Sequence, residues 1–106
     1  MNNYCNISCT TDSIIVANTI INELLNRKLI ACGQVSEINS SYWWKDEIIN
    51  SHEYLINMKS KKTLYKDIEQ VIKNNHNYEV CEIIVTDIVD GNKDYFDWID
   101  NNTRHY

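Results

Sequence analysis

Four cysteines, Cys5, Cys9, Cys32 and Cys81, are the side chains with the widest chemistry in this chain of 106 residues. Thiolates bind soft metals, form disulfides and act as nucleophiles. None of the four lies in a Cys-x-x-Cys motif, which argues against a zinc ribbon. On one extended strand Cys5 and Cys9 would lie about 13 Å apart, too far for a disulfide. We therefore expect free, buried thiols that behave as small hydrophobic side chains.

Common catalytic and nucleotide-binding motifs are not found in the sequence. It has no Gly-x-Ser-x-Gly elbow, P-loop, Gly-x-Gly-x-x-Gly or His-Glu-x-x-His motif. Cys32 and His76 have the residue types of a thiol nucleophile and its base, but no third residue that would orient the base is evident. The segment DGNKDYFDWIDN from Asp90 lacks the sixth-position glycine and the final glutamate of a calcium loop. We expect a protein that is not an enzyme.

An aromatic cluster is the second unusual feature. The segment Ser40–Ile48 reads SSYWWKDEI and places Tyr42, Trp43 and Trp44 side by side. Adjacent residues on a strand point to opposite faces of a sheet, so the two indoles cannot enter one core. Tryptophan and tyrosine are common anchors of protein interfaces. We expect one of Trp43 and Trp44 to belong to a contact between subunits.

Hydrophobic periodicity predicts the elements that must position these residues. The expected order is β-α-β-β-α-β followed by a short helix, which is typical of the ferredoxin-like split βαβ fold in one α+β domain over residues 1–106. The expected elements are a strand over 3–9, a helix over 13–28, a strand over 29–44 with a break near Gly33 or Ser36, a turn at Lys45 and Asp46, a strand over 47–59, a helix after Ser60, a strand over 78–89 and a helix over 92–103.

Local signals mark the helices. The segment Thr11–Ser13 offers a cap for the first helix, and Ser60 offers one for the second. Arg27 and Lys28 are expected in the last turn of the first helix, where the helix dipole favours cations. The apolar residues expected on the core faces are Ile14, Ala17, Ile21, Leu24 and Leu25 in the first helix, Leu64, Ile68, Val71 and Ile72 in the second, and Tyr95, Trp98 and Ile99 in the third.

Apolar residues occupy both faces of the expected strands. On the third strand, Tyr54, Ile56 and Met58 share one face, and Leu55 lies on the other. Two helices can cover only one face of a four-stranded sheet. We therefore expect further copies of the chain to cover the remaining apolar surface.

Composition excludes several classes of function. The net charge of -5 does not favour binding to nucleic acid or to an anionic membrane. The basic run at Lys59–Lys62 is too short for a nucleic-acid surface. No apolar run of about 18 residues predicts a membrane span, and the N-terminus does not have the features of a signal peptide. We expect a cytosolic protein that binds neither nucleic acid nor membrane.

Five blocks of the sequence resemble the CutA divalent-cation-tolerance proteins in order and spacing. The blocks are LIACGQV (29–35), SSYWWKDEI (40–48), SHEYLINMKS (51–60), HNYEVCEII (76–84) and DGNKDYFDWI (90–99). The resemblance implies the ferredoxin-like fold and a homotrimer in which three sheets meet. That assembly is similar to the one formed by PII signalling proteins, which hold small effectors in clefts between subunits. The resemblance also implies a role in tolerance of divalent metals, copper above all.

The resemblance implies a set of metal ligands. Cys32 and His76 match family positions that can supply a thiolate and an imidazole, which copper favours, and Glu53 and Glu79 can add carboxylates. In this fold the strand of Cys32 lies at a sheet edge, far from the strand after His76, so such a site would form across a subunit boundary. A packed thiol remains the alternative for Cys32, and a turn histidine that caps the second helix remains the alternative for His76. We expect copper or another divalent cation to be bound without being required for folding.

A second interpretation is a pocket for a small organic anion, which Tyr42, Trp44, Lys59 and Tyr78 would line together with the two glutamates. Lys59 and Glu53 lie on one strand about 20 Å apart, so they cannot pair within one chain. Each can reach a neighbouring subunit, and an ion pair across the trimer is the structural alternative.

Three departures from the family sequence affect turns. Asn77 and Cys81 stand where the family usually has proline, and Asp46 stands where it usually has glycine. Each change is expected to loosen a turn, because a fixed or a permissive backbone residue is lost. Cys81 adds a possible soft ligand that is peculiar to this sequence.

Overall fold

The computed structural model describes residues 3–105; Met1, Asn2 and Tyr106, at the ends of the expected domain, lie outside the described residues. The elements are β1 (Tyr4–Thr11), α1 (Ile14–Asn26), β2 (Cys32–Trp44), β3 (Glu47–Lys61), a 3-10 turn (Lys62–Leu64), α2 (Tyr65–Asn75), β4 (Ile83–Asp87) and α3 (Lys93–Asn101).

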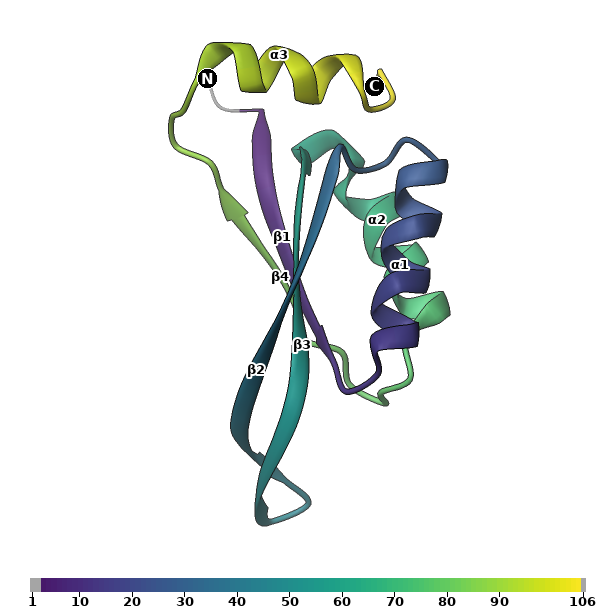
Figure 1. Cartoon of the computed structure of the whole chain (residues 1–106), viewed down its shortest axis with the longest axis vertical. Coiled ribbons are helices and arrows are strands. Elements are labelled where there is room, and N and C mark those ends of the chain that lie inside the picture. Colours follow the sequence, from purple (N-terminus) through teal and green to yellow (C-terminus); the bar gives the residue numbers. More distant parts are fainter. Residues whose placement is uncertain (1–2, 106) are drawn as a thin grey trace.

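The predicted order of elements is confirmed. The strands form one antiparallel sheet in the order β2-β3-β1-β4, which is the strand order of a ferredoxin-like split βαβ sheet. Helices α1 and α2 cover one face of the sheet, and α3 lies across the end opposite the β2–β3 turn (Figure 1). No helix within residues 3–105 is both long and apolar enough to cross a membrane.

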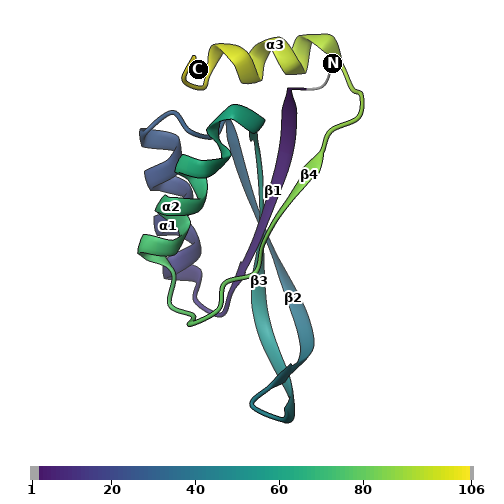
Figure 2. The same cartoon turned by 180° about the vertical axis from the view of Figure 1, so that it is seen from behind.

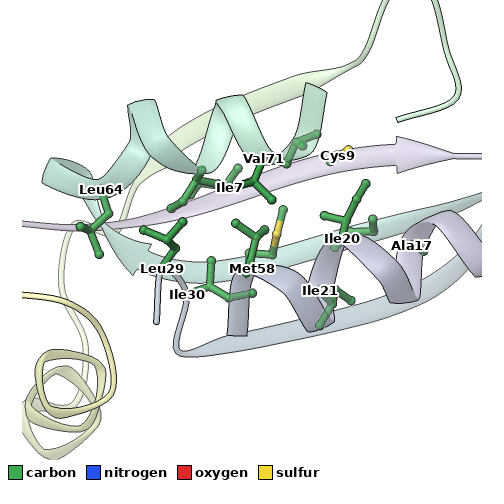
Figure 3. Close-up of a cluster of buried hydrophobic side chains, with 14 of the residues drawn as sticks. Ile7, Cys9, Ala17, Ile20, Ile21, Leu29, Ile30, Met58, Leu64 and Val71 are labelled. Carbon is green, nitrogen blue, oxygen red and sulfur yellow. The ribbon is translucent and has the colours of Figure 1, made fainter. Parts of the chain in front are cut away.

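The hydrophobic core lies between this sheet face and the two helices (Figure 3). Every second residue of β1 enters it, namely Cys5, Ile7 and Cys9, opposite Ile56 and Met58 of β3. The apolar stripe predicted for the second helix is buried. In α1, Ile20 is buried as well, whereas Ile14 and Leu25 at the two ends of the helix remain partly exposed.

Both ends of α1 have specific caps. Ser13 caps the helix, because its Oγ accepts a hydrogen bond from the backbone N–H of Val16. The helix ends earlier than predicted: Arg27 is its C-cap, and Lys28 lies beyond it with φ 59°. The backbone N–H groups of Lys28 and Leu29 bond to the carbonyls of Leu25 and Leu24, which is the Schellman arrangement. The expected place of the two cations in the last turn was therefore wrong.

Strand β2 runs without the predicted break. Gly33 lies within the strand, and a Cβ atom there would come within 2.8 Å of Ile21 Cγ2. This glycine therefore allows α1 to approach the sheet closely and does not interrupt the strand. The predicted turn at Lys45 and Asp46 is confirmed, and both residues have positive φ, of 50° and 65°, as a type I′ hairpin turn requires.

The β2–β3 hairpin extends past the helices (Figures 1 and 2). The chain extends 44 Å along its longest axis, whereas the 13 residues of α1 span about 20 Å. The Cα radius of gyration is 14.4 Å, above the roughly 13 Å of a compact domain of about this length. The distal half of the hairpin therefore cannot be covered by the helices of its own chain.

The predicted cap of the second helix was wrong. Ser60 belongs to β3, where its buried hydroxyl donates a hydrogen bond of 2.6 Å to the carbonyl of Leu29. Helix α2 starts after a 3-10 turn, five residues later than Ser60. The serine thus holds the loop between α1 and β2 instead of capping a helix.

The last strand is much shorter than the predicted 78–89. Strand β4 pairs with β1 only from Ile83 to Asp87. The preceding residues leave the sheet, because His76 and Tyr78 bond to Thr10 and Glu53 instead of continuing the strand ladder. The final helix α3 forms within the predicted range, but of the three residues expected on its core face only Ile99 is buried. Tyr95 and Trp98 remain exposed, so that part of the prediction was wrong.

Candidate functional site

A cleft of about 640 Å³ lies between the hairpin and the segment 77–82 that leads into β4. The hairpin contributes Tyr42, Trp43 and Trp44, β3 contributes Glu53, and β1 contributes Thr10. The residues of the segment 77–82 that line the cleft include Tyr78, Glu79 and Glu82. Aromatic rings and carboxylates therefore form much of its wall.

Glu53 and Tyr78 are joined inside the cleft. Glu53 is only 4% exposed, and the Tyr78 hydroxyl donates a hydrogen bond of 2.5 Å to its Oε2. Burial first, and then this hydrogen bond, raise the pKa of the Tyr78 hydroxyl well above the usual tyrosine value. Within residues 3–105 this is the one hydrogen bond of the Glu53 side chain, and no cationic side chain pairs with it.

His76 uses both ring nitrogens on backbone groups. Its Nδ1 accepts a hydrogen bond of 3.0 Å from the N–H of Tyr78, so Nε2 carries the proton and donates to the carbonyl of Thr10 at 2.7 Å. As the C-cap of α2 it also packs its ring 4.9 Å from the Tyr78 ring. In this geometry His76 positions Tyr78 and has no free lone pair for a metal.

Asn77 anchors the same turn at a position where the family usually has proline. Its Oδ1 accepts a hydrogen bond of 2.8 Å from Thr11 Oγ1, and its Nδ2 donates to Asp12 Oδ1 at 2.7 Å. These two bonds tie the segment before β4 to the loop before α1. They offset the loosening expected from the loss of proline.

The four proposed metal ligands do not meet within one chain. Cys32 lies opposite Lys59 at one end of β3, and His76 contacts Thr10, which lies opposite Leu55. Strand spacing separates these two places by on the order of 15 Å. Across the described part of the chain, no three His, Cys, Asp or Glu side chains are grouped as metal ligands. A resident metal site therefore does not fit a single chain.

The proposed ligand-binding residues are divided between two places. Tyr42, Trp44 and Tyr78 line the cleft, as do Glu53 and Glu79. Lys59 does not line it: this residue lies six positions along β3 from Glu53 and donates a hydrogen bond of 3.0 Å to Gln34 Oε1. Of the described residues that line the cleft, none is Lys, Arg or His.

Sequence reasoning did not assign Trp43, Asn77, Val80 and Glu82 to the cleft, which they line. It treated residues 78–82 as strand, whereas this segment folds beside the hairpin. One signal was available: two positions in or next to this segment are usually proline in the family, and proline disfavours a central strand.

The thiols fall into two groups. Cys5 and Cys9 are fully buried, and burial is the main cause that raises their pKa values to about 11 and about 12. Cys32 and Cys81 are half-buried, and Cys81 lines the cleft. All four are free thiols, as predicted, although full burial holds only for the first two.

These features define a ferredoxin-like α+β protein with a cleft suited to non-covalent binding. The chain belongs to the CutA1 divalent ion tolerance protein family, whose model matches residues 5–102. Proteins of this family are not known enzymes.

Individual relatives agree with this assignment. The divalent-cation tolerance protein CutA of Thermus thermophilus is 34% identical over 95 residues, which cover 89% of this chain and 92% of the relative. The chloroplastic protein CutA 1 of rice is 34% identical over 107 residues, but only 60% of its length is matched. The crystal structure of CutA1 from a psychrotrophic Shewanella has a TM-score of 0.94 at 34% identity, with 98% of both chains covered. CutA1 from Ehrlichia chaffeensis has a TM-score of 0.91 at 34% identity, with 99% of both covered.

Proposed function

We propose that this protein, as a single domain over residues 1–106, is a cytosolic homotrimer that binds or responds to copper or a similar divalent cation. The observation that carries the proposal is the match of residues 5–102 to the divalent ion tolerance family. The chain matches 86% of a relative from Pyrococcus horikoshii and 92% of one from Thermus thermophilus. Both relatives are named divalent-cation tolerance protein CutA.

Exposed apolar surface on the hairpin supports the assembly. Trp43 is 70% exposed, and its cross-strand neighbour Ile48 is 63% exposed. The helices of the same chain are too short to reach this part of the hairpin. Burying large apolar side chains stabilises a protein by about 1.5–3 kcal/mol each. A homotrimer that covers the hairpins of its members would obtain this stabilisation.

The metal ligands in this proposal come from more than one chain. Cys32 and His76 provide a thiolate and an imidazole, with Glu53 and Glu79 as carboxylates, and this combination suits copper. Because one chain keeps Cys32 and His76 apart, they can share an ion only across a subunit boundary. To bind a metal, His76 would also have to release one of its backbone partners, Thr10 or Tyr78.

The free thiols support the cytosolic location. Cys32 and Cys81 are half-buried and unpaired in disulfides. Partly exposed thiols persist in a reducing compartment, whereas oxidising compartments favour disulfides.

Calorimetric titration with copper tests this function. The wild type is expected to produce stoichiometric heat, and the double variant Cys32→Ser, His76→Asn is expected to lose it. The exposed His52 provides a matched control, because His52→Asn removes an imidazole that lies near Glu37 and against the edge of the Tyr54 ring, away from Cys32 and His76 in the sequence. No heat from the wild type, or equal heat from the double variant, would refute ligation by these residues.

The cleft favours a second candidate function, that of a PII-like sensor for a small molecule. Its volume of about 640 Å³ falls in the range of small-molecule pockets. In this case the effects of metals on the protein would be indirect.

A further inference from the structure

The electrostatics of the cleft call for a positive charge. Glu53 is almost fully buried, and within residues 3–105 it receives a single hydrogen bond, from Tyr78. A buried carboxylate without a cationic partner is costly. Glu79 and Glu82 add two further carboxylates to the wall, whereas no cation among the described residues lines it. An organic anion, the ligand expected from the sequence, would meet repulsion here.

The walls of the cleft favour an organic cation over a metal ion. Tyr42, Trp44 and Tyr78 present aromatic rings to the cleft, and such rings attract weakly hydrated cations through their electron-rich faces. Trp44 already has this type of contact, because Lys45 Nζ lies 5.6 Å from the centre of its ring. A metal ion needs several converging ligands, and the described residues contain no such group of three.

The two tyrosine rings of the cleft are held in place by hydrogen bonds. Tyr42 Oη accepts a hydrogen bond of 3.3 Å from Ser51 Oγ, and Tyr78 is bonded to Glu53 and packed against His76. The ligand would therefore meet a partly preformed site.

From this geometry we infer that the cleft binds a small organic cation that carries an ammonium group. Glu53 is the counter-charge, and Tyr42 and Tyr78, which bond to Ser51 and to Glu53 itself, are the aromatic walls beside it. This inference rests on the small-molecule candidate above and deepens it by naming the ligand class. It does not require the metal response.

Saturation-transfer NMR tests the inference. The probe is tetramethylammonium, which is added to the full chain, and its methyl signal reports binding. Saturable binding is expected, together with none for tert-butanol, a neutral molecule of similar shape. Glu53→Gln should weaken binding at least tenfold, and Tyr42→Leu should also weaken it. Far-UV circular dichroism checks that each variant is folded.

Glu69→Gln is the matched control. Glu69 also accepts a hydrogen bond from a tyrosine, Tyr65, at 3.0 Å, but on the surface of α2 and away from the cleft. This variant should bind the probe as the wild type does. Equal weakening by Glu69→Gln and Glu53→Gln, or no saturable binding by the wild type, would overturn the inference.

A lysine of a second copy is the competing source of the cation, and Lys59 is its candidate. If Lys59→Gln creates probe binding that the wild type lacks, the cleft is filled by a neighbouring chain and the inference is wrong.

The two proposals fail separately: a copper signal that depends on Cys32 and His76, without ammonium binding, would overturn only the inference. Ammonium binding without a copper signal would overturn only the metal response.

Discussion

The hydroxyl of Tyr78 lies 2.5 Å from Glu53 Oε2 and joins the segment before β4 to the middle of β3. Tyr78 is itself positioned by His76, the C-cap of α2. Two hydrogen bonds of Tyr78 thus connect a helix end, an irregular segment and a central strand. The cleft has its shape because these bonds divert residues 78–82 from the sheet.

Tyr78→Phe should destabilise the protein. The substitution leaves a buried carboxylate without its donor, and the free energy of unfolding should fall by about 1–3 kcal/mol. Urea denaturation measures this change. Tyr65→Phe is the control: it removes the less buried bond to Glu69 and should lower the free energy of unfolding by less than about 1 kcal/mol. Equal losses in the two variants would show that burial of Glu53 adds nothing.

Lys28→Gly should stabilise the protein. Lys28 has φ 59° directly after the C-cap of α1, where a side chain is strained and glycine is not, so a gain of about 1 kcal/mol is expected. Thermal unfolding should show a higher midpoint. The neighbouring Arg27 has φ -85°, so Arg27→Gly offers no relief and should lower the midpoint. A lower midpoint for Lys28→Gly would contradict the Schellman assignment.

Stability should decrease in alkaline solution. The hydrogen bond to Asp100, and then burial, raise the pKa of Tyr4 from 10.0 to about 12. Since the folded state favours the protonated form, this contribution is complete below pH 10 and is lost as the pH rises towards 12. The buried thiols of Cys5 and Cys9 act with the same sign from pH 9 upwards.

Urea unfolding between pH 8 and pH 12 measures this dependence. Tyr4→Phe removes one titrating group and should make the fall above pH 10 less steep. If this variant has the same slope as the wild type, Tyr4 does not contribute to the alkaline loss.

The four thiols should differ in reactivity. Cys5 and Cys9 are fully buried with raised pKa values, and thiolates are the reactive form. In the native protein an aromatic disulfide reagent should therefore modify Cys32 and Cys81 before either of them. Peptide mass mapping after timed quenching gives the order. Early modification of Cys9 would mean that β1 opens readily or that the core is arranged differently.

Features that depend on neighbouring residues were predictable from the sequence. The turn at Lys45 and Asp46 lies between two apolar runs, and the stripe from Leu64 to Ile72 has helical spacing. Both features are found in the structure, because each is determined by residues close to it in the sequence. The resemblance to a family added the assignment that periodicity alone could not provide.

Features that depend on distant residues were not predictable. Ser60 has the residue type of a helix cap, but its hydroxyl bonds to Leu29, 31 residues away. Glu53 and Tyr78 lie 25 positions apart in the sequence, so their hydrogen bond was likewise not evident from it. The aromatic and acidic residue types of the cleft were visible in the sequence. Their meeting place, and the separation of Lys59 from it, required the fold.

The mass of the particle in solution tests the proposed assembly most directly. Multi-angle light scattering at micromolar concentration should give three times the 12.5 kDa of one chain, because three chains are expected to cover the hairpin with Trp43 and Ile48. A folded, soluble particle of 12.5 kDa would contradict the trimer, and with it every metal site that joins Cys32 of one chain to His76 of another.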